Sequence, residues 1–135
     1  MSRFLLDTCT VSMAMRPDRH RDRLTKLASI EASSAFASVT LSELRFGSAR
    51  LPEGGVRDRL MAAIDELAKR FSILSFDATA AEWHADQRAR LERLGRRPPF
   101  ADGQIAAVAA ANDLTLVTLN AADFEPFDGL RVESW

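Results

Sequence analysis

Four acidic residues, widely separated along the chain, occupy positions from which their carboxylates could meet and hold a cation. Asp7 directly ends the apolar run FLL, which has the character of a short buried strand. Glu43 and Asp102 each stand in the first turn of a predicted helix, and Asp123 follows a predicted strand. Carboxylates that lie close together repel, so either some stay protonated or a cation neutralises them. Oxygen ligands without a His or Cys cluster favour Mg²⁺ or Mn²⁺.

Each of these acids also has an ordinary structural interpretation as a helix or turn cap. Asp7 suits a capping position, and Thr40 to Glu43 matches a capping box in which Glu43 bonds back to the Thr40 backbone. Asp102 and Asp123 could cap the turns that they begin. Capping does not explain why all four should reach one edge of the fold, or why an acid ends an apolar strand.

Strands and helices are predicted to alternate along the chain. Apolar patterning predicts strands at 3–6, 35–39, 71–76 and 114–119, with a short last one at 130–132. Helices are predicted at 10–14, 18–31, 40–50, 56–71, 77–94 and 102–111. This order predicts a single α/β domain over 1–135, a three-layer α/β/α sandwich with a mainly parallel central sheet. Sites in such sheets form beyond the carboxyl ends of the strands, where Asp7 is expected.

Composition excludes several other classes of protein. With 135 residues and a net charge of −1, the chain can bury a core but carries no global basic field. Cys9 is the only cysteine, so no internal disulfide can form, and its predicted role is packing. His20 and His84 lack zinc-site spacing. No apolar run is long enough to cross a bilayer, and no signal peptide is recognisable, so a cytoplasmic location away from membranes is expected.

The basic residues are almost all arginines, and they cluster. All but two of the 18 Lys and Arg residues are arginines. One group falls within 16–23 and another within 88–97. The planar arginine fork suits phosphate, although a solvated helix face would explain the same clusters.

The sequence resembles the PIN-domain ribonucleases, and within them the VapC-type toxins of bacterial toxin–antitoxin pairs. Four stretches carry the likeness in the family's order, from residue 4 to about 127: LLDTCTVS, TLSELRFG, FADGQIAAVAAANDLTLVTLN and NAADF. One departure is Cys9, which stands where the family usually has Asn after the Asp-Thr pair.

The resemblance implies a metal-dependent endoribonuclease that hydrolyses phosphodiester bonds in structured RNA, such as a tRNA or rRNA loop. It implies one or two Mg²⁺ or Mn²⁺ ions, the first held by Asp7, Glu43 and Asp102 and the second, or its waters, near Asp102 and Asp123. Supporting roles fall to Thr8, Thr118 and Asn120, which would orient carboxylates or water, and to Arg93, Arg96 and Arg97, which would hold the RNA backbone.

The resemblance also implies protein partners. These are a small VapB-like antitoxin, a second copy of the chain in a homodimer, and promoter DNA reached only through the antitoxin. Candidate groove residues for the antitoxin are Leu44, Phe46, Leu51, Leu60 and Ile64, although core packing would explain them equally well.

Two other functions remain as alternatives. One is a non-catalytic PIN-like protein that binds nucleic acid as a regulatory subunit, which measurable metal binding would distinguish. The other is an Asp-based phosphotransfer domain, which fits less well. A phosphatase of that type usually has a second acid at the position of Cys9. A receiver domain has a lysine near the end of a late strand, and neither Lys26 nor Lys69 is at such a position.

Overall fold

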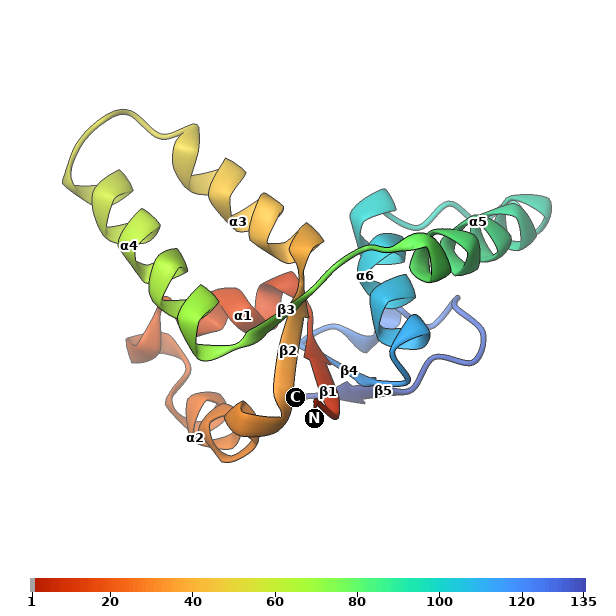
Figure 1. The fold of residues 1–135 in the computed structure, drawn as a ribbon, viewed down its shortest axis with the longest axis horizontal. Coiled ribbons are helices and arrows are strands. Elements are labelled where there is room, and N and C mark those ends of the chain that lie inside the picture. Colours follow the sequence, from red (N-terminus) through yellow and green to blue (C-terminus); the bar gives the residue numbers. More distant parts are fainter. Residues whose placement is uncertain (1) are drawn as a thin grey trace.

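A five-stranded sheet forms the centre of the molecule in the computed structural model, which describes residues 2–135 (Figure 1). The strand order is β3-β2-β1-β4-β5, and all four neighbouring pairs are parallel. The strands are β1 (Phe4–Leu6), β2 (Ser34–Ala37), β3 (Ser72–Leu74), β4 (Thr115–Thr118) and β5 (Val132–Ser134). The predicted alternation is therefore confirmed, with the last strand two residues later than expected.

Helices connect the strands and cover both faces of the sheet. The helices are α1 (Thr8–Met13), α2 (Arg21–Ile30), α3 (Ser38–Ala49), α4 (Gly55–Arg70), α5 (Ala78–Arg93) and α6 (Phe100–Ala111). Short 3₁₀ turns lie at Pro17–Arg19, Glu31–Ser33 and Ala121–Asp123. Figure 1 shows α1, α2 and α4 on one side of the sheet and α5 and α6 on the other.

Two apolar cores result from the alternation of side chains along the central strands. Leu5 and Leu6 are both fully buried but belong to different cores, because successive strand residues point to opposite faces. Leu5 packs with residues of α5 and α6, including Leu91 and Ile105. Leu6 packs with residues of α1, α2 and α4, including Leu27. This arrangement confirms the three-layer α/β/α sandwich.

Three helices begin two residues earlier than the sequence predicted, and the differences matter for the acids. Helix α3 begins at Ser38, so Thr40 lies inside it and does not cap it. Helix α6 begins at Phe100 after Pro99, so Asp102 lies in its first turn without being its cap. Helix α1 begins at Thr8, directly after Asp7, whose side chain does cap it.

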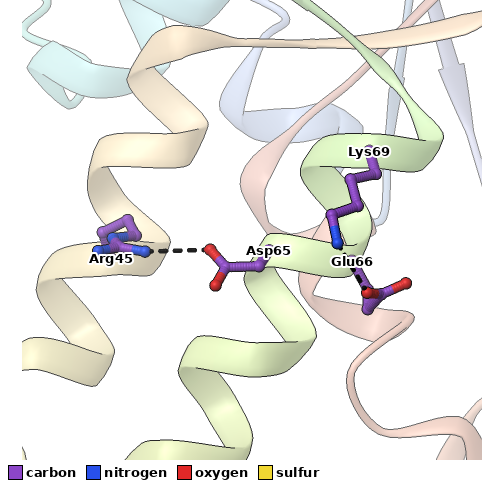
Figure 2. A network of polar contacts seen from close by, with 4 residues as sticks. All are labelled: Arg45, Asp65, Glu66 and Lys69. Atoms are coloured by element: carbon purple, nitrogen blue, oxygen red, sulfur yellow. Dashed lines mark hydrogen bonds and ion pairs between the residues drawn. The ribbon is translucent and has the colours of Figure 1, made fainter.

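Figure 2 shows two ion pairs on the exposed surface of the α3–α4 pair, of which one joins the two helices. Arg45 Nη1 lies 3.2 Å from Asp65 Oδ1, and Lys69 Nζ lies 3.4 Å from Glu66 Oε1 within α4. Exposed pairs of this kind contribute about 0–1 kcal/mol. Burial of Ile64 and Leu67, which are 1% and 3% exposed, is therefore the main force that holds α4 in place.

Helices α5 and α6 approach closely at Gly103, next to Asp102. A Cβ atom at position 103 would lie 2.7 Å from His84 Nε2 and 3.0 Å from its Cδ2. His84 cannot easily move aside, since it is buried and its ring contacts Phe76 and Phe100 with centroids 5.8 and 4.9 Å away. The close approach therefore requires glycine.

Gly103→Ala is expected to lower the free energy of unfolding by up to about 2 kcal/mol. Overpacking typically costs about 1–3 kcal/mol, and the better helix propensity of Ala recovers at most about 1 kcal/mol. Gly47→Ala in α3 is the matched control, because a Cβ there meets nothing within 4 Å, and it should stabilise the protein. Urea unfolding measures both variants. Equal effects of the same sign would contradict the packing argument.

Candidate active site

The candidate site lies where the sheet changes its direction of winding. From β1 the chain crosses to β2 on one side, whereas β4 pairs with β1 on the other side. Asp7 follows the carboxyl end of β1, and Thr118 ends β4 beside it. Such switch points are where α/β sheets form their sites.

Asp7 is a nearly buried carboxylate held by three hydrogen-bond donors. Its Oδ1 accepts from the Thr10 backbone N (2.9 Å) and from Thr10 Oγ1 (2.6 Å). Its Oδ2 accepts from Thr118 Oγ1 at 2.6 Å. The side chain is 6% exposed. A carboxylate oxygen has two lone pairs, so Oδ2 keeps one that could serve a metal ion.

Glu43 reaches the site through a short chain of hydroxyl groups. Thr8 Oγ1 donates to Glu43 Oε1 at 2.6 Å and lies 3.0 Å from Thr40 Oγ1. Since Thr8 has a single hydroxyl proton, Thr40 must donate to Thr8. Thr8 follows β1 and Thr40 lies in α3, so this chain fixes α3 against the start of α1. The alternative capping-box interpretation of Thr40 and Glu43 does not hold, because α3 begins at Ser38. For the same reason the prediction that Glu43 lies in the first turn of this helix is wrong.

Asp102 carries the clearest sign that the four carboxylates lie close together. Burial, and then the negative charges of Asp123, Asp7 and Glu43, raise the pKa of Asp102 from 3.8 to about 6. Asp123 is itself oriented by Asn120, whose Nδ2 donates to Asp123 Oδ2 at 3.0 Å. Four acids from distant parts of the sequence thus act on one another electrostatically.

The negative charge of this cluster is not neutralised by the protein itself. Within residues 2–135, none of the four acids forms an ion pair, in contrast to Asp65 and Glu66 on α4 (Figure 2). In the same part of the chain, no three His, Cys, Asp or Glu side chains already form a metal-ligand group. The donors are all hard oxygens, which fits Mg²⁺ or Mn²⁺ better than zinc.

Cys9 and His84 lie near the site without a catalytic arrangement. Cys9 is exposed, so the predicted packing role is wrong. Although the residue is exposed, its sulfur is partly desolvated; this partial desolvation and the charges of the four acids raise the pKa of the thiol, which disfavours the nucleophilic thiolate. Burial, and then the charge of Arg88, lower the pKa of His84, which packs between aromatic rings.

The three arginines predicted to hold RNA occupy different surroundings. Arg96 and Arg97 line a hollow of about 320 Å³ together with Asp123, so they lie at the edge of the acidic cluster. Arg96 Nη2 is paired with Glu125 Oε2 at 2.9 Å. Arg93 is exposed in the last turn of α5 and does not line that hollow.

Sequence reasoning missed Thr10, and it assigned Thr40 a different contact. The spacing from Asp7 to Thr10 is a usable signal, because an N-cap Asp accepts from the backbone three residues on. Nothing in the sequence connects Thr40 with Thr8, since the contact arises only when α3 packs against α1.

Thr118→Val is expected to lower the free energy of unfolding by about 1–3 kcal/mol. The fully buried hydroxyl donates to Asp7 and accepts from the Asn120 backbone N at 3.0 Å, so Val leaves a charged acceptor and a donor without a partner. Thr118→Ser keeps the hydroxyl and is the control. Equal stability of the Val and Ser variants in urea unfolding would show that these bonds contribute nothing.

This fold, with its acids at the switch point, defines a PIN-type domain. Residues 4–129 match the PIN domain family, and the chain belongs to that family. The expected resemblance is therefore confirmed.

Its relatives include bacterial toxins and nucleases. The chain is 34% identical to the tRNA(fMet)-specific endonuclease VapC of Shigella flexneri, covering 100% of this chain and 99% of the relative. It is 30% identical to toxin FitB of Neisseria gonorrhoeae, covering 97% of each. Its structure is similar to a chain of DNA-bound VapBC from Salmonella typhimurium, with a TM-score of 0.89 and 29% sequence identity. The match covers 100% of this chain and 99% of the Salmonella chain.

Proposed function

We propose that this protein is a metal-dependent endoribonuclease, and that it acts as the toxin of a toxin–antitoxin pair. The observation that carries the proposal is the group of four unpaired carboxylates, in which mutual repulsion helps to raise the pKa of Asp102 to about 6. Relatives named as ribonucleases and toxins support the same activity.

The carboxylates fit a divalent cation by charge and by donor chemistry. Asp7, Glu43 and Asp102 would hold one Mg²⁺ or Mn²⁺ ion, with Asp102 and Asp123 near a second ion or its waters. When bound, the metal neutralises charge on the phosphate and lowers the pKa of the attacking water. The protein's own share is to fix the ligands.

Hydroxyl and amide groups would do that positioning. Thr118 holds Asp7, Thr8 holds Glu43, and Asn120 holds Asp123, each by the hydrogen bond described above. Because these bonds restrain the carboxylates before an ion arrives, less ordering is needed on binding. Loss of such a supporting contact typically costs about 10–100-fold in metal affinity or activity, so Thr118→Val should also slow cleavage.

We propose a structured RNA, such as a tRNA or rRNA loop, as the substrate. The Shigella flexneri relative is named for tRNA(fMet), which favours tRNA among these choices. A loop presents its phosphates and bases where a duplex hides them. Arg96 and Arg97, which line the same hollow as Asp123, are placed to contact a phosphate at the edge of the site. Arg93 would contact the RNA backbone from the exposed last turn of α5.

We also propose a small VapB-like antitoxin as partner. The solved neighbours include VapBC and FitAB complexes, some with DNA, so promoter DNA would be reached through the antitoxin in a complex of toxin homodimers. Phe46 on α3 is 66% exposed and suits such contact, whereas Ile64 is 1% exposed and belongs to the core. No helix in residues 2–135 is long and apolar enough to span a membrane. The proposed site of action, the cytoplasm, is where the RNA substrate is found.

The phosphotransfer alternative does not fit the structure. Lys26 lies on α2, where it pairs with Glu133, and Lys69 lies on α4, where it pairs with Glu66. Neither lysine follows a strand that borders the acids. The comparisons also assign the chain to the PIN family.

End-group analysis of the products tests the proposed function. The purified protein is incubated with total cellular RNA and Mg²⁺ or Mn²⁺, and the fragments are sequenced from their ends. A water nucleophile needs no 2′-hydroxyl attack, so discrete fragments with 5′-phosphate and 3′-hydroxyl ends are expected. Cyclic 2′,3′-phosphate ends would contradict the mechanism. The absence of both cleavage and metal binding would favour the regulatory alternative.

A further inference from the structure

Two hollows share residues of the loop that leads into α6. The first is the 320 Å³ hollow that contains Asp123. The second, of about 390 Å³, is lined by Arg88, Glu92 and Phe100. Arg96, Arg97 and Pro98 line both. The loop therefore connects the edge of the acidic cluster with a separate hollow that the proposed catalytic groups do not use.

The second hollow contains an exposed aromatic ring that is held in place. Phe100 is 53% exposed, although it begins α6 only two residues before Asp102. The buried His84 contacts the ring edge-on, with centroids 4.9 Å apart. Phe100 and Asp102 are two residues apart in α6, about 200° around the helix axis, so their side chains point to different sides. The ring is thus a fixed apolar surface that is connected to the acidic cluster through Arg96 and Arg97, which line both hollows.

The charge around this ring suits a polyanion. The Arg88 guanidinium carbon lies 4.8 Å from the centroid of the Phe100 ring, an arrangement typical of cation–π contact. Within residues 2–135, neither Arg88 nor Arg97 forms an ion pair, whereas Arg96 is held by Glu125. Glu92 is the one acid that lines the hollow, against three arginines.

We propose that Arg88, Arg97 and Phe100 form a binding site for the single-stranded nucleotide next to the cleaved bond. The base stacks on Phe100 beside the Arg88 guanidinium, and Arg97 contacts the phosphate between this base and the acidic cluster. Aromatic rings combined with basic groups are how proteins hold single strands without reading sequence. The inference rests on the proposed function, because it assigns RNA to the same site.

Binding of a short RNA tests the inference apart from cleavage. The probe is a fluorescein-labelled single-stranded RNA of ten nucleotides with mixed sequence. Its affinity is measured by anisotropy with Mg²⁺, in an Asp102→Asn background that prevents cleavage. Phe100→Leu should raise Kd about five- to a hundredfold, the range of one lost base stack, and Phe100→Trp should retain binding. Arg97→Gln should weaken binding and reduce the slope of log Kd against log salt by about 0.7.

Matched variants separate this surface from general effects. Val56→Ala and Arg59→Gln change exposed residues of α4 and should bind as the parent does. If Phe100→Leu proves unstable on heating, Arg88→Gln removes the cation beside the ring without touching His84. Unchanged affinity in the Phe100 and Arg97 variants overturns the inference even when the wild type cleaves RNA. Loss of affinity confined to these variants, in a protein that cleaves nothing, supports the binding site and rejects the nuclease.

Discussion

Replacing Asp102 with asparagine is expected to reduce RNA cleavage by at least roughly a hundredfold while stabilising the metal-free fold. Asn keeps the size and one oxygen of Asp but removes the charge that a cation needs. Loss of a supporting residue alone typically costs about 10–100-fold, so loss of a proposed ligand should cost no less. Cleavage of total RNA, followed by gel electrophoresis, measures the effect.

The stabilisation follows from the sign of the pKa shift. Burial and three neighbouring carboxylates raise the pKa of Asp102 to about 6 in the folded chain, against 3.8 for the ordinary side chain. The folded state therefore binds a proton more tightly than the unfolded state, and between about pH 4 and pH 6 its stability falls as the pH rises. At pH 7.5 the wild type bears the full unfavourable effect, which Asn removes. The melting temperature of Asp102→Asn should exceed that of the wild type at pH 7.5 and approach it near pH 4.

Asp86→Asn provides the control for charge removal in general. Asp86 is exposed on α5, and its replacement should reproduce neither the loss of cleavage nor the rise in melting temperature at pH 7.5. A lower melting temperature for Asp102→Asn at pH 7.5 would mean that Asp102 serves the fold as a helix-start residue. Full activity of that variant would remove Asp102 from the catalytic machinery.

The positions of Asp7 and Asp102 were predictable because they depend on local sequence patterns. An apolar run that ends in Asp7, and a helix start that holds Asp102, are visible within a few residues each. Alternation of strands and helices then implies a parallel sheet, which brings strand ends to one edge. The strand order β3-β2-β1-β4-β5 does not follow from the pattern, because several orders satisfy the same alternation.

The partners of the acids were not predictable, because they come from contacts between distant elements. Thr40 reads locally as a cap for its own helix, yet in the structure its hydroxyl serves Thr8 and, through Thr8, Glu43. Likewise, Thr118 is 111 positions from Asp7 and meets it only because β1 pairs with β4. Local sequence rules identify polar residues at helix starts and strand ends. The packing of the helices and the sheet determines which of these residues form hydrogen bonds with the acids.

Removal of divalent metal is expected to abolish cleavage reversibly. EDTA should stop the reaction, and Mg²⁺ or Mn²⁺ in excess should restore it, because no basic side chain in residues 2–135 forms an ion pair with the four acids in place of a cation. The metal should also raise the melting temperature at pH 7.5, since a ligand at about 100 times its Kd stabilises the folded state by about 2.7 kcal/mol. Cleavage that persists in EDTA would reject the proposed metal site.

Measuring metal-dependent cleavage and melting temperature at a series of pH values tests whether Asp102 is a metal ligand. Protons compete with the cation for this carboxylate, so metal affinity and cleavage at subsaturating metal should rise with pH through about 6. Saturating metal should move the midpoint below 6, because a bound cation favours the charged carboxylate. In Asp102→Asn, the thermal response to metal should be weak and should lose its step near pH 6. If neither excess metal nor the Asp102→Asn substitution moves the pH midpoint of cleavage, the titrating group is not Asp102. Asp102 would then not be a metal ligand.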